Sequence, residues 1–183
     1  MFRGKGRYDA AMATGREAWL LAGQTLLRRG GVHAVKLQAL CEELGLTTGS
    51  FYHHFGGMPS YLDALAGYYG TEQTLDNTRQ ADDPDPHARI RKLLAIAHDD
   101  RMRPLDAAMR DWAGTNPIAA AAVEEADTVL LRFLERAFLD LGCDRSDARV
   151  RSLLLLSAGV ARLTPPWRVT RAMATAAIDL LAP

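Results

Sequence analysis

Hydroxyl and imidazole side chains gather in one short segment of the chain, TTGSFYHHF at residues 47–55. At helical spacing, one face of this segment carries Thr48, Gly49, Tyr52 and His53. The opposite face carries two phenylalanines four residues apart. Hydroxyl and imidazole groups hydrogen-bond to phosphates and to base edges, and a face without acidic or bulky aliphatic side chains can enter a major groove. The chemistry indicated is recognition of double-stranded nucleic acid.

Two short helices joined by a tight turn are predicted to position this face. Apolar side chains recur at i, i+3, i+4 and i+7 ahead of it, at Leu37, Leu40, Cys41 and Leu44. Gly45 is expected to end that helix, because glycine adopts the left-handed conformation without steric cost. Thr47 is a plausible N-cap for the next helix. The pattern is that of a helix-turn-helix.

The region from about Thr14 to Leu65 resembles the DNA-binding domain of the tetracycline-repressor-like (TetR) family. An apolar first helix, Gly30, the glycine turn and the ending Phe-Tyr-His-His-Phe at residues 51–55 carry the resemblance. Two positions depart from the family pattern. Met58 stands where a phosphate-contacting lysine is usual, and Lys36 stands where a threonine often begins the second helix.

The resemblance implies an all-α fold in two domains. Residues 1–60 would form a three-helix DNA-binding domain with the helix-turn-helix, and residues 61–183 a helical regulatory and dimerisation domain. Such a protein is a ligand-responsive transcriptional regulator, in most cases a repressor that binds a palindromic operator as a dimer and is released by a small molecule. The alternative is a TetR-like ligand-binding or scaffold protein that has lost operator binding, for which Met58 is the motivating departure.

Seven residues are expected to contact DNA: Lys36, Thr47, Thr48, Gly49, Tyr52, His53 and His54. Thr47 and Tyr52 would hold phosphates, and Thr48, Gly49 and His53 would lie nearest to base edges. Lys36 and His54 are additional candidates for the backbone. For Thr47, capping and phosphate contact are compatible, whereas the alternative for Tyr52 is a partly buried ring. Phe51, Phe55 and Cys41 are expected in the core.

The charge of the chain is unevenly distributed. Residues 1–60 carry seven basic and four acidic side chains, a net charge of +3, and the remainder carries −3. The basic half contains the motif, which favours contact with phosphates. Arg3, Lys5 and Arg7 form a basic arm that could reach along the backbone or into a minor groove, or could be a solvated tail.

Beyond Phe55 the periodicity predicts helices only. A first helix has Pro59 in its first turn, and residues 81–87 (ADDPDPH) form a loop. The next helix has the buried stripe Ile90, Leu93, Leu94 and Ala97. A short helix from Pro104 to Gly114 follows, and then a long helix from Pro117 to Gly142 that Asn116 caps. Asp144 and Asp147 start a helix from Arg145 to about Ala161, and a last helix, Trp167–Leu181, follows the break at 164–166.

The helices Arg145–Ala161 and Trp167–Leu181 carry more apolar residues than one buried stripe requires. The resemblance implies that they pair with their symmetry mates as a four-helix homodimer interface. The alternative is the core of a monomer.

An effector site is expected among residues that combine an apolar body with adaptability or one polar handle: His98, Met102, Met109, Trp112 and Phe133. They suit an apolar or aromatic small molecule, although side chains of these types are more often plain core than ligand contacts. The sequence contains no nucleophile elbow and no phosphate-binding loop, and its five histidines do not have the spacing of metal ligands. We therefore expect neither catalysis nor a metal or other cofactor. Two unpaired cysteines and the lack of a signal-type or membrane-spanning apolar run favour a cytoplasmic protein without membrane contact.

Overall fold

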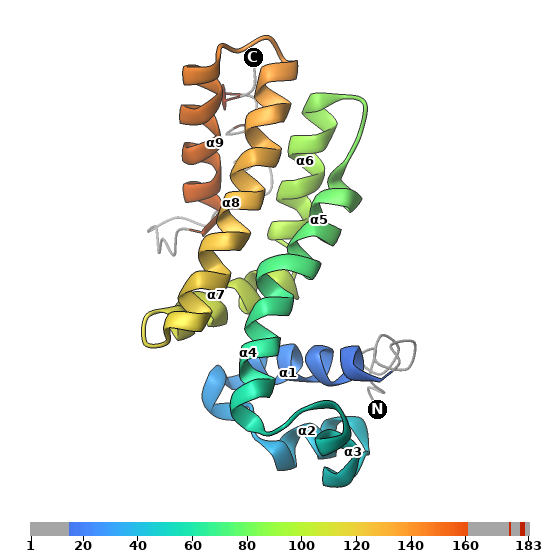
Figure 1. Cartoon of the computed structure of the whole chain (residues 1–183). Coiled ribbons are helices and arrows are strands. Elements are labelled where there is room, and N and C mark those ends of the chain that lie inside the picture. The colour runs from blue at the N-terminus through green and yellow to red at the C-terminus, as the bar shows by residue number, and fades with distance from the viewer. Residues whose placement is uncertain (1–14, 161–175, 177–179, 182–183) are drawn as a thin grey trace. The chain divides into compact units, whose positions relative to one another are not determined.

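The computed structural model describes residues 15–160, 176, 180 and 181 of the 183-residue chain (Figure 1). These residues form helices and turns with no strand, which confirms the predicted all-α class. The chain divides into two compact units. Unit 1 comprises Met1–Tyr69 and Ala107–Val123, and unit 2 comprises Gly70–Asp106 and Glu124–Pro183.

Four helices and one short 3₁₀ turn make up the N-terminal part of unit 1. They are α1 (Arg16–Gly30), η2 (Val32–Ala34), α2 (Leu37–Leu44), α3 (Thr48–His54) and α4 (Met58–Tyr68). Large side chains from all four helices are fully buried in a common core, among them Trp19, Leu27, Leu40, Phe51, Tyr61 and Leu65. Burial of each such side chain stabilises the fold by about 1.5–3 kcal/mol, so α3 is held by packing and not by its own short length.

Unit 2 is built from the helices that follow. The chain passes through a π-helical turn, η3 (Tyr69–Gln73), into α5 (Thr74–Ala81), α6 (Pro86–Ala97), α7 (Met102–Ala113), α8 (Pro117–Asp140) and α9 (Arg145–Val160). Helices α7 and α8 each contribute residues to both units. The core of unit 2 joins α5, α6, α8 and α9 through Ala81, Ile90, Leu93, Leu134, Ala137, Phe138, Ala148 and Leu155.

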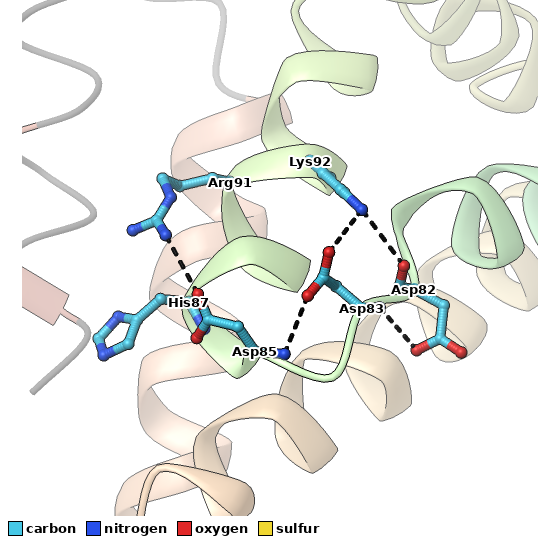
Figure 2. A network of polar contacts seen from close by, with 6 residues as sticks. All are labelled: Asp82, Asp83, Asp85, His87, Arg91 and Lys92. Carbon is cyan, nitrogen blue, oxygen red and sulfur yellow. Dashed lines mark hydrogen bonds and ion pairs between the residues drawn. The ribbon is translucent and has the colours of Figure 1, made fainter.

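The predicted loop between α5 and α6 is present but shorter than predicted, because Ala81 ends α5 and Pro86 and His87 begin α6. The charged side chains in and beside it bond one another. Figure 2 shows the Lys92 ammonium donating to the Asp83 carboxylate at 2.7 Å, while the same carboxylate accepts the Asp85 N–H at 2.9 Å. Asp85 in turn caps α6 by accepting the His87 N–H at 3.0 Å. The charges of this acidic loop are thus paired with neighbouring side chains, Asp83 with Lys92 and Asp85 with Arg91. The described residues contain no group of three His, Cys, Asp or Glu side chains that could hold a metal ion.

Several predicted helix boundaries are confirmed by capping bonds. The Asn116 side chain accepts the N–H groups of Ile118 and Ala119, each at 3.0 Å, at the start of α8. Asp144 accepts the Asp147 N–H at 2.9 Å at the start of α9. Pro59 lies in the first turn of α4, as predicted.

Two details of the predicted helices were wrong. Helix α7 begins at Met102 instead of Pro104, because the Asp99 carboxylate accepts the N–H groups of Arg101 and Met102 and starts the helix earlier. Ala97 was predicted to be buried but is exposed, as the last residue of α6.

Some expectations concern parts of the chain outside the described residues. The basic arm of Arg3, Lys5 and Arg7, the break at 164–166 and most of the predicted last helix belong to this group. Within the described part of the chain, no helix is long and apolar enough to cross a membrane.

Candidate nucleic-acid interface

The turn between α2 and α3 has the predicted conformation. Gly45 adopts φ 68° and ψ 29°, the left-handed region, and caps α2. The N–H of Leu46 then donates to the carbonyl of Cys41 at 3.0 Å, which closes the end of the helix. A residue with a Cβ would be strained at position 45, so glycine makes this tight turn possible.

Helix α3 begins at the predicted cap. Thr47 has extended backbone angles, and its side-chain oxygen accepts the Ser50 N–H at 3.4 Å. This satisfies one of the free amides of the first turn, although the bond is long. The helix contains seven residues, Thr48–His54, and depends on its neighbours for order.

One side of α3 is anchored by aromatic packing. Phe51 is fully buried, and its ring lies edge-on to Trp19 of α1, with 5.4 Å between the centroids. Phe55, which follows the helix, is also buried and lies 5.3 Å from Phe51. The prediction that both phenylalanines belong to the core is confirmed.

The other side of α3 is exposed over its length. Thr48, Gly49, Tyr52 and His53 are all exposed, as their spacing predicts, and Tyr52 retains 59% of its accessible surface. Among the described residues, neither the Tyr52 hydroxyl nor the His53 ring has a hydrogen-bond partner. The side chains on this face therefore offer donors and acceptors to an external partner, and Tyr52 is not the partly buried ring of the alternative interpretation.

The remaining candidate contacts differ in exposure. Lys36 is exposed at the N-cap position of α2 and makes no side-chain capping bond. His54 is half-buried, with its ring 5.1 Å from His53 and 6.3 Å from Phe55. Met58, which stands where the family pattern has a phosphate-contacting lysine, is half-buried and is the first residue of α4.

The structure adds one basic group that the sequence-based set lacks. The Arg16 guanidinium, in the first turn of α1, lies 5.2 Å from the centre of the Phe55 ring, and Arg16 is exposed. It therefore stands beside the end of α3, although 39 positions separate Arg16 and Phe55 in sequence. In the sequence, only the excess of basic residues in residues 1–60 indicated that Arg16 could contribute to this surface.

Cys41 is less buried than predicted. It is half-buried and, with Leu37, Leu46 and Thr48, borders an open groove of about 570 Å³ beside the turn. Of the apolar stripe on α2, Leu40 alone is fully buried.

The residues expected at an effector site fall into both units. His98, Met102 and Phe133 belong to unit 2, whereas Met109 and Trp112 belong to unit 1. His98 is exposed, with its Nδ1 atom 2.8 Å from the Leu94 carbonyl oxygen, and the Met102 sulfur accepts a bond from the Gln73 amide at 3.2 Å. Met109 and Trp112 are buried. Neither unit by itself contains all five.

Residues 20–65 match the family model described as bacterial regulatory proteins, tetR family. No curated protein matches the chain.

Solved structures share the fold over nearly the whole chain. A transcriptional regulator from Rhodococcus sp. Rha1 has a TM-score of 0.71 at 17% identity, covering 92% of this chain and 94% of its own. The TetR-family regulator PfmR from Thermus thermophilus has a TM-score of 0.59 at 20% identity, with coverage of 93% and 96%.

A third similar structure was solved with its ligands. AibR, in complex with isovaleryl coenzyme A and operator DNA, has a TM-score of 0.63 at 19% identity, with coverage of 92% and 98%. At these identities the likeness concerns the fold. Residues 20–65 thus match the tetR-family model, and the chain shares the fold of solved transcriptional regulators, a TetR-family member among them.

Proposed function

We propose that this protein is a ligand-responsive repressor that binds a palindromic operator as a homodimer. The observation that carries the proposal is the two-sided construction of α3, with Phe51 buried beneath and Thr48, Tyr52 and His53 exposed above. A helix anchored from behind by a rigid core presents its outer side chains in fixed positions, which base readout requires.

Each exposed residue has a distinct role in this proposal. Thr47 and Tyr52 hold phosphates through their hydroxyls, and the His53 ring reads a base edge. Thr48 lies beside it, and Gly49 lets the helix approach the groove closely because it has no side chain. Lys36, His54 and Arg16 add contacts to the backbone.

Dimerisation and release complete the proposal. The exposed aliphatic side chains of α9 supply the homodimer contact. Residues 1–60 serve DNA binding in this proposal, and residues 61–183 serve regulation and dimerisation. AibR was solved with both an acyl coenzyme A and operator DNA, which supports a small-molecule effector here. His98, Met102, Met109, Trp112 and Phe133 remain its candidate contacts, with an apolar or aromatic ligand as the class. The proposal involves no catalytic step.

Selection from random double-stranded DNA at low salt tests the proposal. We expect recovery of a palindrome whose half-sites lie about 34–36 Å apart, or a multiple of that distance. Affinity for the recovered duplex should fall linearly on a log–log plot against salt, because bound phosphates release counterions. Retention of no sequence at all would reject operator binding and favour the alternative of a TetR-like scaffold or ligand-binding protein.

A further inference from the structure

Gly23 lies at a point where α1 and α4 approach each other very closely. A Cβ atom placed on Gly23 would lie 2.0 Å from the Tyr61 hydroxyl oxygen and 3.0 Å from the Cδ2 atom of Leu65. A side chain at position 23 would therefore force the Tyr61 ring to shift. Glycine is unfavourable within a helix, so its presence in the middle of α1 indicates that the close approach is required.

The Tyr61 hydroxyl uses this space to bond the backbone of α1. It donates to the carbonyl oxygen of Trp19 at 2.7 Å, and the bond is fully buried. Burial raises the pKa of Tyr61 well above its ordinary value, and a hydrogen bond from the Gly23 backbone offsets a part of that rise. The hydroxyl is therefore protonated at neutral pH and available as a donor.

The ring of the same residue contacts the aromatic side chains that anchor α3. Its centroid lies 5.4 Å from that of Phe51 and 4.9 Å from that of Phe55, the latter in an edge-on arrangement. One buried side chain thus joins the backbone of α1, its own helix α4 and the aromatic anchor of the DNA-facing helix.

We propose that Tyr61, seated against Gly23, is the positioning residue that sets α3 for DNA. Without the bond from its hydroxyl to Trp19, the ring of Tyr61 is free to shift, and Phe51 and Phe55 shift with it because they pack against that ring. The exposed side chains of α3 then leave the positions that base readout needs. This inference rests on the operator binding proposed above.

Tyr61→Phe is the decisive variant, because it keeps the ring and removes the hydroxyl. Tyr68→Phe is the matched control. Tyr68 is also on α4, and its hydroxyl also bonds α1, at the Glu17 carboxylate at 3.1 Å, but that bond is exposed. Two measurements are made on the full chain: amide hydrogen exchange of residues 48–55 without DNA, and affinity for the duplex recovered by selection beside a scrambled duplex.

For Tyr61→Phe we expect faster exchange in α3 and a loss of about two- to tenfold in affinity for the selected duplex, the range for one net hydrogen bond. Affinity for the scrambled duplex should fall less, because base readout is lost only on the selected duplex, whereas the general attraction to phosphates remains for both. Tyr68→Phe should match the wild-type protein in both measurements.

Gly23→Ala tests the contact from the other side. Its methyl group would meet the hydroxyl oxygen, so we expect the same changes with larger size. Adding Tyr61→Phe should recover part of the loss, because it removes the atom that clashes. Independent, additive effects of the two substitutions would contradict direct contact.

The outcomes separate this inference from the proposed function. Unchanged exchange and affinity in Tyr61→Phe would overturn the positioning role, as would faster exchange spread evenly over all helices. If the wild-type protein retained no duplex while Tyr61→Phe still loosened α3 selectively, the positioning would stand and operator binding would be rejected.

Discussion

Helices α3 and α9 both expose large side chains, but the chemistry of the two faces differs. The exposed face of α3 consists of Thr48, Gly49, Tyr52 and His53, whose polar groups can form hydrogen bonds. The exposed face of α9 includes Val150, Leu153 and Leu154, which are 53%, 57% and 52% exposed and have no polar side-chain atom.

The contrast indicates which kind of partner each face suits. A polyanion with its hydration shell is bound through donors, acceptors and positive charge, and the Arg16 guanidinium lies beside the end of α3. Aliphatic side chains gain nothing from phosphate but gain free energy when another protein surface removes them from water. The polar face of α3 therefore suits the DNA of the proposed function, and the aliphatic face of α9 suits the proposed contact with a second copy of the chain.

The largest expected effect comes from charging the face of α9. Leu153→Asp with Leu154→Asp should convert a dimer that is stable at micromolar concentration into a monomer. Each buried leucine contributes about 1.5–3 kcal/mol, and two-fold symmetry counts each substitution twice. Light scattering should then give the chain mass of 20.0 kDa in place of twice that mass.

Leu75→Asp is the matched control for that variant, because Leu75 is an exposed leucine of α5 in the same unit. It should leave the mass of the assembly unchanged. A dimer that survives both α9 substitutions would show that this face is not the interface.

On the polar face of α3, removal of a single polar group should already weaken DNA binding. Tyr52→Phe removes one hydroxyl and keeps the ring, and should weaken binding by a similar factor for every DNA sequence, by about 1.5–3 kcal/mol at most. His53→Ala should also relax preference at one or two base pairs per half-site. Affinities for the selected duplex and its single-base variants measure both effects. Thermal melts provide the control, since a lower melting temperature with unchanged DNA binding would identify these residues as structural.

Helix ends that a single residue determines through its own conformation or side chain could be predicted from the sequence. Gly45 ends α2 because its own backbone conformation does so, and Asn116 starts α8 because its own side chain bonds the first turn. Such signals act within a few residues and need no knowledge of the remaining fold. The exposed face of α3 was predictable for the same reason, since helical spacing alone places Tyr52 away from the buried side that Phe51 occupies.

Features decided by distant neighbours could not be predicted in this way. Arg16 reaches the end of α3, and Gly23 meets Tyr61, only because α1 packs against α3 and α4. Ala97 fits the stripe of α6 in sequence but is exposed in the structure. The start of α7 ahead of Pro104 is a different case, because the Asp99 capping bonds that set it are local. The effector residues illustrate the same limit, because an apolar residue at helical spacing does not reveal which unit it joins.

Position 47 separates the folding of α3 from its contact with DNA. Thr47→Ala should cost about 0.5–2 kcal/mol of stability, towards the lower end because the capping bond to Ser50 is 3.4 Å long. Thr47→Asp keeps a good cap but places a negative charge at the proposed phosphate contact. We expect the aspartate variant to melt like the wild-type protein and to bind the selected duplex much more weakly. Equal losses of stability and affinity in both variants would mean that Thr47 acts through capping alone.

The smallest expected effect concerns the acidic loop between α5 and α6. Its polar groups already bond one another and are therefore not available to an external partner. The hydrogen bond from Lys92 lowers the pKa of the Asp83 carboxyl below its ordinary value, assisted by the N–H of Asp85 (Figure 2). A lowered folded-state pKa stabilises the native state above the unfolded value of about 3.9, and that contribution is lost as the pH falls through the folded value.

Lys92→Met should therefore raise the pKa of Asp83 towards the ordinary value, as followed by carbon NMR of the carboxyl group. The accompanying decrease in melting temperature should be small at neutral pH and should vanish in acid, where Asp83 is protonated in both proteins. Binding to DNA should not change, because these charges are paired within the loop whereas the donors of α3 are not. A Lys92→Met variant with altered affinity for the selected duplex would contradict the distinction between self-paired and available polar surfaces on which the assignment of α3 depends.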